Sequence, residues 1–286
     1  MKMGLRVLFL AGVVVALLAP SPSLAQRGGG RGRGGELAPP APPAPRWPDG
    51  RINLGPPPGE TGMWSGNGRL IRNPNSYEPN NAGNRNARIA IEDVPFRPWA
   101  LALVDYNHAN FLKDEPHTAC KPSGGPRQFI TPYGFEIVDM PELGRVYVFD
   151  IGGPHSYRII YMDGRGHPED LTPSYYGHSI GNWEGDTLVI DTVGFNERFW
   201  TNRDGFPHTD QLHLTERITR VDFNTLDYTV TFDDPGAYTE PWTSGFVNTW
   251  QSDSEIWEYI CQDNNLSRDS MTAAAGAAET FISIVP

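Results

Sequence analysis

Residues 212–233 read LHLTERITRVDFNTLDYTVTFD, and this stretch decides the fold class. In its second half the apolar residues fall on one face of an extended chain: Leu226, Tyr228, Val230 and Phe232. A period of two residues is typical of a β-strand with one buried face. The tetrapeptide DFNT between the two halves is rich in residues that favour turns. The stretch therefore predicts two antiparallel strands joined by a turn.

The same period recurs from Gln128 onward, in nine segments separated by Gly, Pro, Asn and Asp. These candidate strands are Phe135–Met140, Arg145–Ile151, Tyr157–Asp163, His178–Trp183, Thr187–Phe195, Leu212–Arg220, Leu226–Asp233, Phe246–Gln251 and Ile256–Cys261. Successive strands with short turns and few helices pair antiparallel. The sequence thus predicts a mainly β domain over residues 128–265, an antiparallel meander that closes into a barrel or folds as a sandwich.

One segment before this domain has a helical pattern. In VPFRPWALALVDYNHANFL, residues 94–112, Pro98 suits a first helical turn because the N–H it lacks would be unpaired there anyway. One face of that helix then carries Trp99, Leu103, Tyr106 and Asn110. We expect one N-terminal amphipathic helix that packs through this face, within a wrapping segment that covers residues 61–127.

The N-terminus has the three parts of a secretory signal peptide. Lys2 and Arg6 form a positive start, residues 8–18 are apolar and uncharged, and Ser23-Leu24-Ala25 offers small residues for signal peptidase. The apolar run is shorter than the roughly 20 residues that a membrane-spanning helix needs. We expect residues 1–25 to be removed, and the mature protein to be periplasmic or secreted, with no membrane span.

The remaining ends have biased composition. Residues 26–60 contain Arg-Gly repeats followed by polyproline runs, which bury too little apolar surface to order themselves. They predict a disordered tether, and residues 266–286 a C-terminal tail. The formal net charge is −11, and signal cleavage would remove two positive charges. This acidity argues against nucleic acid as a partner, and the sequence leaves the oligomeric state open.

The chain has two cysteines, Cys120 and Cys261. In an oxidising compartment such a pair predicts a disulfide, and the alternative is two free thiols. A bridge closing so long a loop would stabilise the fold by about 4–5 kcal/mol in the chain-entropy model.

The block GHSIGNWEGDTLVIDTVGFNERFW, residues 177–200, holds the most informative polar residues. Asp191 lies between two valines in a strand that is apolar on both faces, so its carboxylate is either paired or has a raised pKa. Asp191 is therefore expected either to form a structural ion pair or to act as a general base or ligand anchor. His178 begins a strand in the same block and is either an acid–base partner of a carboxylate or a histidine held in a turn.

Further candidates lie in two other blocks. In residues 204–220, Glu216 is a second carboxylate on an apolar face. The motif YMDGRGHP, residues 161–168, predicts a turn with Arg165 and His167 at its tip. We expect His178, Asp191 and Glu216 to be catalytic if the protein is an enzyme. The candidate substrate-binding residues are Arg165, Trp183, Arg217 and His213.

A metal ion is a weaker alternative. His208 and His213 are five residues apart, which places them on opposite faces of a regular strand unless the loop around His208 turns it back. No strict metal-ligand spacing is present. No phosphate-binding loop or dinucleotide fingerprint is present either, so we expect no organic cofactor.

Six segments together resemble a widespread group of secreted bacterial proteins that is largely uncharacterised: CKPSGGPR, YMDGRGHP, GHSIGNWEGDTLVIDT, PHTDQLHLTER, YTEPWT and YICQDNN. The resemblance covers residues 61–265 and implies no activity for named residues. The β-meander and the tripeptide GNW resemble lipocalin-like barrels more loosely, and likeness of fold does not fix function.

Two functions follow with nearly equal weight. The barrel could bind a small apolar or amphipathic molecule in an internal cavity. Alternatively, the protein is a cofactor-independent hydrolase, lyase or isomerase whose His178, Asp191 and Glu216 converge within about 3–6 Å. A tethered structural protein of the envelope and a metal-dependent hydrolase are the remaining alternatives. The sequence leaves open whether the protein is an enzyme and what its ligand is.

Overall fold

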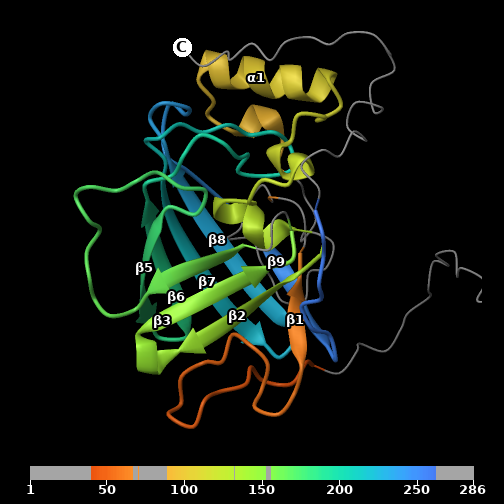
Figure 1. Ribbon diagram of the computed structural model, residues 1–286, viewed down its shortest axis with the longest axis vertical. Coiled ribbons are helices and arrows are strands. Elements are labelled where there is room, and N and C mark those ends of the chain that lie inside the picture. The colour runs from red at the N-terminus through yellow and green to blue at the C-terminus, as the bar shows by residue number, and fades with distance from the viewer. Residues whose placement is uncertain (1–39, 67–69, 71–88, 132, 153–155, 262–286) are drawn as a thin grey trace, which may run out of the picture. The chain divides into compact units, whose positions relative to one another are not determined.

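A computed structural model describes residues 40–66, 70, 89–131, 133–152 and 156–261. The expected signal peptide, residues 26–39 of the expected tether and the tail at 266–286 lie outside the described residues. The described part is a closed barrel of nine strands with short helices at its ends (Figure 1). The strands are β1 Gly62–Ser65, β2 Phe135–Met140, β3 Arg145–Asp150, β4 Tyr157–Tyr161, β5 His178–Glu184, β6 Thr187–Val193, β7 His213–Asp222, β8 Thr225–Asp233 and β9 Trp242–Ser252.

Each strand pairs with its neighbours in chain order, and β1 closes the barrel against β9. All neighbouring pairs are antiparallel except β4 and β5, which are parallel. The segment 162–177 must therefore run back along the barrel before β5 begins. The predicted mainly β fold is confirmed, and closure of the sheet selects the barrel over the sandwich.

One expected strand is absent, and one strand is present that the sequence did not predict. The predicted strand Ile256–Cys261 has no regular structure, and Ile260 is 75% exposed. Its apolar residues have no sheet edge to join because β9 already pairs with β1. The ninth strand is β1, inside the segment predicted to be a wrapping loop. Four residues are too few to display a period of two, and the barrel consequently begins upstream of residue 128.

The expected tether is ordered in its second half. Ile52 and Leu54 are buried in the core, and the Arg220 guanidinium donates hydrogen bonds to the carbonyl oxygens of Asn53 (2.9 Å) and Gly55 (2.7 Å). The prediction of disorder up to residue 60 is therefore wrong. The composition of residues 26–60 as a whole is low in apolar residues, and it does not indicate that Ile52 and Leu54 anchor the second half to the core.

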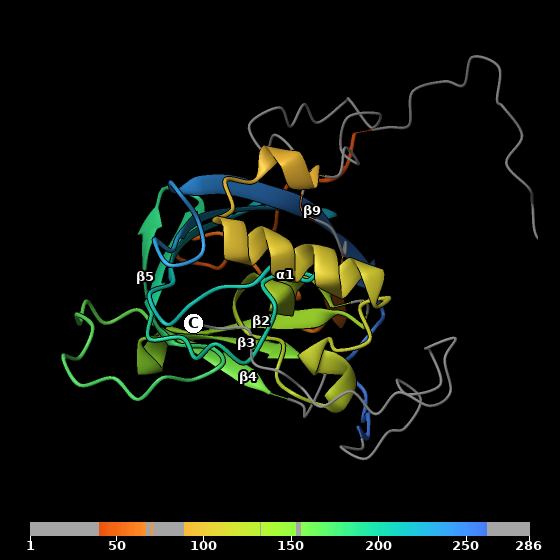
Figure 2. The same ribbon diagram turned by 90° about the horizontal axis from the view of Figure 1, so that it is seen from above.

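Helix α1, Pro98–Ala109, forms where the sequence predicts it and lies across one end of the barrel (Figure 2). The buried face differs from the predicted one. It consists of Ala100, Val104 and Asn107, whereas Tyr106 is 40% exposed. Small side chains let the helix backbone approach the loops beneath it, as the bond from Asn107 Nδ2 to the Gly205 carbonyl illustrates (3.1 Å).

The barrel interior holds aromatic side chains around a buried ion pair. Arg158 on β4 donates hydrogen bonds to both carboxylate oxygens of Glu216 on β7, one of them at 2.9 Å. It also donates to Ser179 Oγ (2.9 Å) and Thr192 Oγ1 (2.6 Å), and the Tyr228 hydroxyl donates to Glu216 (2.7 Å). All five residues are buried. Because each charge is satisfied by neighbours, this network is compatible with the apolar core around it.

A disulfide joins Cys120, which follows α1, to Cys261, near the end of the described chain, as the sequence predicts. It ties two segments 141 residues apart. Among the described residues, no helix is both long and apolar enough to cross a lipid bilayer.

Candidate functional site

Three functional candidates share the outer face of β5, β6 and β7. In β6 the side chain of Thr192 points into the barrel, so that of its neighbour Asp191 points outward. His178 on β5 and His213 on β7 also face outward, next to inward-facing Ser179 and Leu214. Strand alternation alone thus brings two histidines and a carboxylate to one surface.

The segment between β4 and β5 adds a third histidine. His167 lies 2.8 Å through Nδ1 from His178 Nδ1, and 2.8 Å through Nε2 from Asp191 Oδ1. It reaches both because the parallel pairing of β4 and β5 forces this segment along the outer face. His213 Nε2 lies 3.0 Å from Asp191 Oδ2. We call these four residues, His167, His178, Asp191 and His213, the histidine–aspartate site.

Both oxygens of Asp191 therefore accept a hydrogen bond from an imidazole. Burial acts to raise the pKa of this carboxyl, but the hydrogen bonds from His167 and His213 outweigh burial, and the pKa lies below its ordinary value. Asp191 is consequently a carboxylate near neutral pH. The sequence left two alternatives for Asp191, a paired carboxylate or a carboxyl with a raised pKa. The structure has the paired carboxylate.

The hydrogen bonds of the chain Asp191–His167–His178 indicate one arrangement of its protons. A carboxylate only accepts, so His167 must donate from Nε2. In the Nε2–H tautomer of His167 the Nδ1 atom accepts, and the Nδ1–H of His178 then donates to it. This leaves Nε2 of His178 as an unprotonated nitrogen. Burial, together with the nearby His167 and Arg165, lowers the pKa of His178, so the imidazole is neutral near pH 7.

Tyr161 of β4 packs against His178, with ring centroids 5.0 Å apart and planes 21° from parallel. The Arg165 guanidinium lies 4.1 Å from the centroid of the same tyrosine ring. Arg165 is held in turn by Asp163, to which its Nε donates at 2.9 Å. The side chains of Asp191 and His213 are 41% and 40% exposed, so the site is open to solvent.

The predicted residues divide between two faces of the barrel. His178, Asp191, His213 and Arg165 come together outside, but Glu216 lies inside the barrel with Arg158. The expected convergence of Glu216 with His178 and Asp191 is therefore not observed. The reason is parity: residues 213 and 216 are three apart on one strand, so they face opposite sides.

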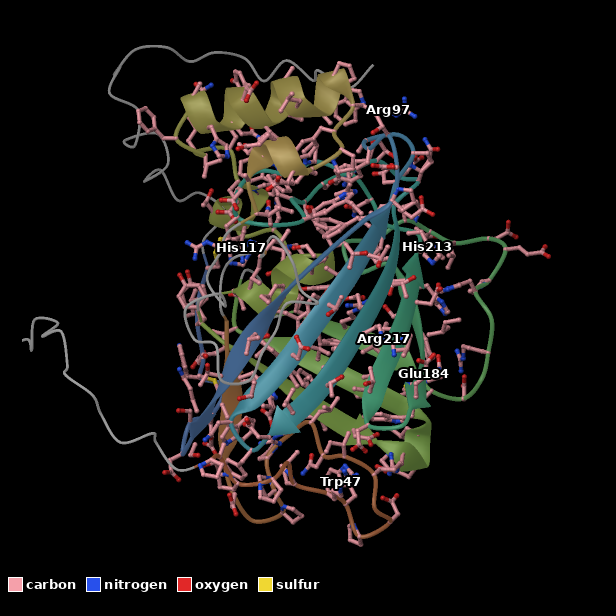
Figure 3. All side chains as sticks on the ribbon, turned by 180° about the vertical axis from the view of Figure 1, so that it is seen from behind. Trp47, Arg97, His117, Glu184, His213 and Arg217 are labelled. Atoms are coloured by element: carbon pink, nitrogen blue, oxygen red, sulfur yellow. A yellow bond between two sulfur atoms is a disulfide. The ribbon has the colours of Figure 1, made fainter. Side chains whose placement is uncertain are left out.

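Two candidate substrate-binding residues lie apart from the histidines. Arg217 is on the outer face of β7, below His213 in Figure 3, and donates to Glu184 Oε2 at 2.8 Å. Trp183 is partly buried and packs against the core.

The candidate metal ligands His208 and His213 do not meet. His208 is buried against Phe199, with ring centroids 4.1 Å apart, whereas His213 is on the outer face. Within the part of the chain that the structure describes, no group of three or more His, Cys, Asp or Glu side chains has the arrangement of a metal site.

The sequence predicts His167 at the tip of a turn, and His167 was not among the candidate site residues. Its signal was its position in YMDGRGHP, a Gly-rich segment before the block that holds His178. Only the parallel pairing of β4 and β5 turns that position into a contact with Asp191.

A second polar cluster lies around the short helix η4, Gly125–Ile130. Asp150 is buried there and accepts a hydrogen bond from the Tyr176 hydroxyl at 3.1 Å. Burial raises the pKa of Asp150 to about 7. Arg127 is also buried, and donates to Glu115 through Nε (3.0 Å) and Nη2 (2.7 Å).

Comparison with protein-family models, curated proteins and solved structures finds no significant match for this chain. The geometry of the histidine–aspartate site is therefore the basis on which its chemistry is argued.

Proposed function

We propose that the protein is an exported acid–base enzyme that works without an organic cofactor, with His178 as its general base. The observation that carries the proposal is the hydrogen-bonded chain Asp191–His167–His178, with 2.8 Å at each step. A carboxylate that orients an imidazole, and compensates the charge formed on it, is the arrangement that many hydrolases use.

The chemistry follows from the protons of this chain. Nε2 of His178 takes a proton either from a water molecule, whose oxygen then bonds to an electrophilic atom of the substrate, or from a substrate carbon, whose electron pair stays on the substrate. His178 then carries a positive charge, which can pass to His167 when the proton between the two Nδ1 atoms shifts. Asp191 stabilises that charge through His167. Positioned proton transfer of this kind contributes typically 10²–10⁴-fold in rate.

His213 is expected to hold the second oxygen of Asp191 and to fix the carboxylate plane. Its Nε2 donates to Asp191, which leaves its Nδ1 as a hydrogen-bond acceptor toward the substrate. The proton that His178 has taken returns from its Nε2 to the leaving group or the product, which completes the hydrolysis, elimination or isomerisation.

The alternative function, carriage of a small apolar molecule inside the barrel, has less support. The Arg158–Glu216 network and the aromatic side chains around it occupy the interior where such a ligand would sit. Export is supported by the Cys120–Cys261 disulfide, because structural disulfides persist in oxidising compartments.

Hydrolysis of p-nitrophenyl acetate by the mature protein tests the proposal without knowledge of the natural substrate. We expect His178→Ala to lower the rate at least tenfold, and His108→Ala, a histidine of α1 outside the site, to leave it unchanged. Because the pKa of His178 is lowered, the base loses its proton below the usual histidine range. The rate should therefore rise with pH at acidic values and level off before pH 7. Equal rates for the wild type and His178→Ala would contradict the proposal.

A further inference from the structure

A cavity of about 400 Å³ opens at the end of the barrel away from α1. One wall is formed by Trp47, Pro48, Asp49 and Arg51, and the other by Asp139 of β2 with Pro141 and Glu142 of the short helix that follows it. Figure 3 shows Trp47 at this end, with Arg97 at the opposite end. None of these residues belongs to the histidine–aspartate site, so the inference does not rest on the proposed function.

The wall at 47–51 is held in place by its own turn and by its flanks. The Trp47 N–H donates to the Arg51 carbonyl and the Gly50 N–H to the Trp47 carbonyl, both at 2.9 Å. Gly50 has φ +88°, a backbone conformation that favours glycine. Ile52 beyond the turn is buried in the core, and Arg46 before it pairs with Asp186 at 2.6 Å. The cavity is thus formed before any ligand arrives.

The charges around the cavity do not balance. Its lining carries three carboxylates, Asp49, Asp139 and Glu142, and one guanidinium, that of Arg51. Arg51 donates from Nε to Asp49 Oδ2 (2.8 Å) and from Nη1 to Asp139 Oδ2 (2.7 Å). The excess of negative charge makes the cavity attractive to cations and repulsive to anions.

Asp139 is the most informative member of this lining. Its side chain is only 10% exposed, yet among the described residues its Oδ1 atom accepts no hydrogen bond. Burial raises the pKa of this carboxyl, and the neighbouring Asp49 and Glu142 raise it further against the opposing effect of Arg51. Asp139 lines the cavity with one oxygen held by Arg51, and its other oxygen can accept a hydrogen bond from a ligand donor that carries positive charge.

We infer that this cavity binds a small organic cation: an ammonium group attached to an apolar body. The ammonium would donate to Asp139 Oδ1, with Glu142 adding long-range attraction. The apolar body would contact the Trp47 ring and the faces of Pro48 and Pro141. The volume lies within the range of known small-molecule sites, about 300–1,000 Å³. A neutral sugar could use the same indole but would leave the excess charge uncompensated.

Calorimetric titration of the full mature protein tests this inference with phenethylammonium as the probe, and with 3-phenylpropan-1-ol and glucose as neutral comparators. We expect phenethylammonium to bind at least tenfold more tightly than either neutral compound, and to bind more weakly as salt is added. Asp139→Asn should weaken its binding at least tenfold. The matched control Asp105→Asn, at an exposed position of α1 at the opposite end of the barrel, should leave the affinity unchanged.

A second variant guards against misfolding of Asp139→Asn, which removes a partner of Arg51. Glu142→Gln lies on the exposed side of the cavity and should weaken binding of phenethylammonium about two- to fivefold, as expected for loss of one charge near a surface. Three results would overturn the inference: no binding of phenethylammonium, equal affinity for 3-phenylpropan-1-ol or glucose, or unchanged affinity in both variants.

Discussion

At the scale of single residues, His178 carries the proposed chemistry because of what its Nδ1 atom contacts. Because the Nδ1–H of His178 donates to His167, the Nε2 atom of His178 is left as the base. Glu216 illustrates the opposite outcome. It is a carboxylate that sequence analysis ranks beside His178, but Arg158 and Tyr228 use both of its oxygens inside the barrel. The hydrogen-bond partners of a side chain, rather than its residue type, decide whether it is reactive or structural.

The Arg158–Glu216 pair gives a stability prediction at this scale. Glu216→Gln leaves the buried Arg158 charge uncompensated, so we expect the free energy of unfolding to fall by about 3–5 kcal/mol in urea denaturation. Replacing both residues by Met removes both charges and should cost less than Glu216→Gln alone. The exposed pair Arg217–Glu184 is the control: Arg217→Met should change stability by about 0–1 kcal/mol. A double variant less stable than Glu216→Gln would contradict this description of the interior.

At the scale of elements, long strands were predictable from their periodicity and short strands were not. β7 and β8 alternate over nine or ten residues, and their outlines were predictable from residues 212–233. β1 has four residues and is defined by its pairing with β9, which no local pattern encodes. The same limit applies to the site. Alternation predicts that Asp191 and Glu216 lie on strands, but their faces depend on which side of each strand the barrel encloses.

The segment before β1 gives a prediction at the element scale. Leu54 is buried, so Leu54→Ala should lower the free energy of unfolding by about 2–5 kcal/mol. Leu143→Ala offers a matched control, since Leu143 is exposed, and should change stability by less than about 0.5 kcal/mol. Equal effects of the two substitutions in chemical denaturation would mean that residues 40–60 behave as the tether that their composition indicates.

At the scale of the whole molecule, the closed barrel sets which parts of the chain meet. The parallel pair β4–β5 sends residues 162–177 along the outer face and brings His167 to Asp191, a contact across 24 residues that no sequence spacing predicts. The disulfide was predictable, because the expected export signal and an even pair of cysteines both point to it. The buried Asp150 was not, because its environment is assembled from η4, β3 and the segment before β5.

Asp150 makes the stability of the molecule depend on pH. Its pKa is raised from 3.8 to about 7 in the folded state, so between these values the folded protein holds a proton that the unfolded chain has released. The stabilisation this gives is complete below about pH 4 and is lost as pH rises through 7. At about 1.4 kcal/mol per pKa unit, the upper bound is about 4 kcal/mol.

Asp150→Asn removes this titration and provides the measurement. The difference in the free energy of unfolding between Asp150→Asn and the wild type should shift in favour of the variant as pH is raised from about 4 to 8. The wild type supplies the control for all other titrating groups. A difference that stays constant over this range would show that Asp150 titrates normally.

The central claim is that the chain Asp191–His167–His178 leaves Nε2 of His178 unprotonated. Long-range proton–nitrogen NMR of the histidine rings near neutral pH tests it most directly, with single-histidine variants used for assignment. We predict His178 as the Nδ1–H tautomer, His167 and His213 as Nε2–H tautomers, and a shift of His178 toward Nε2–H in His167→Phe. His178 found protonated at Nε2 in the wild type would contradict the claim and remove the proposed base.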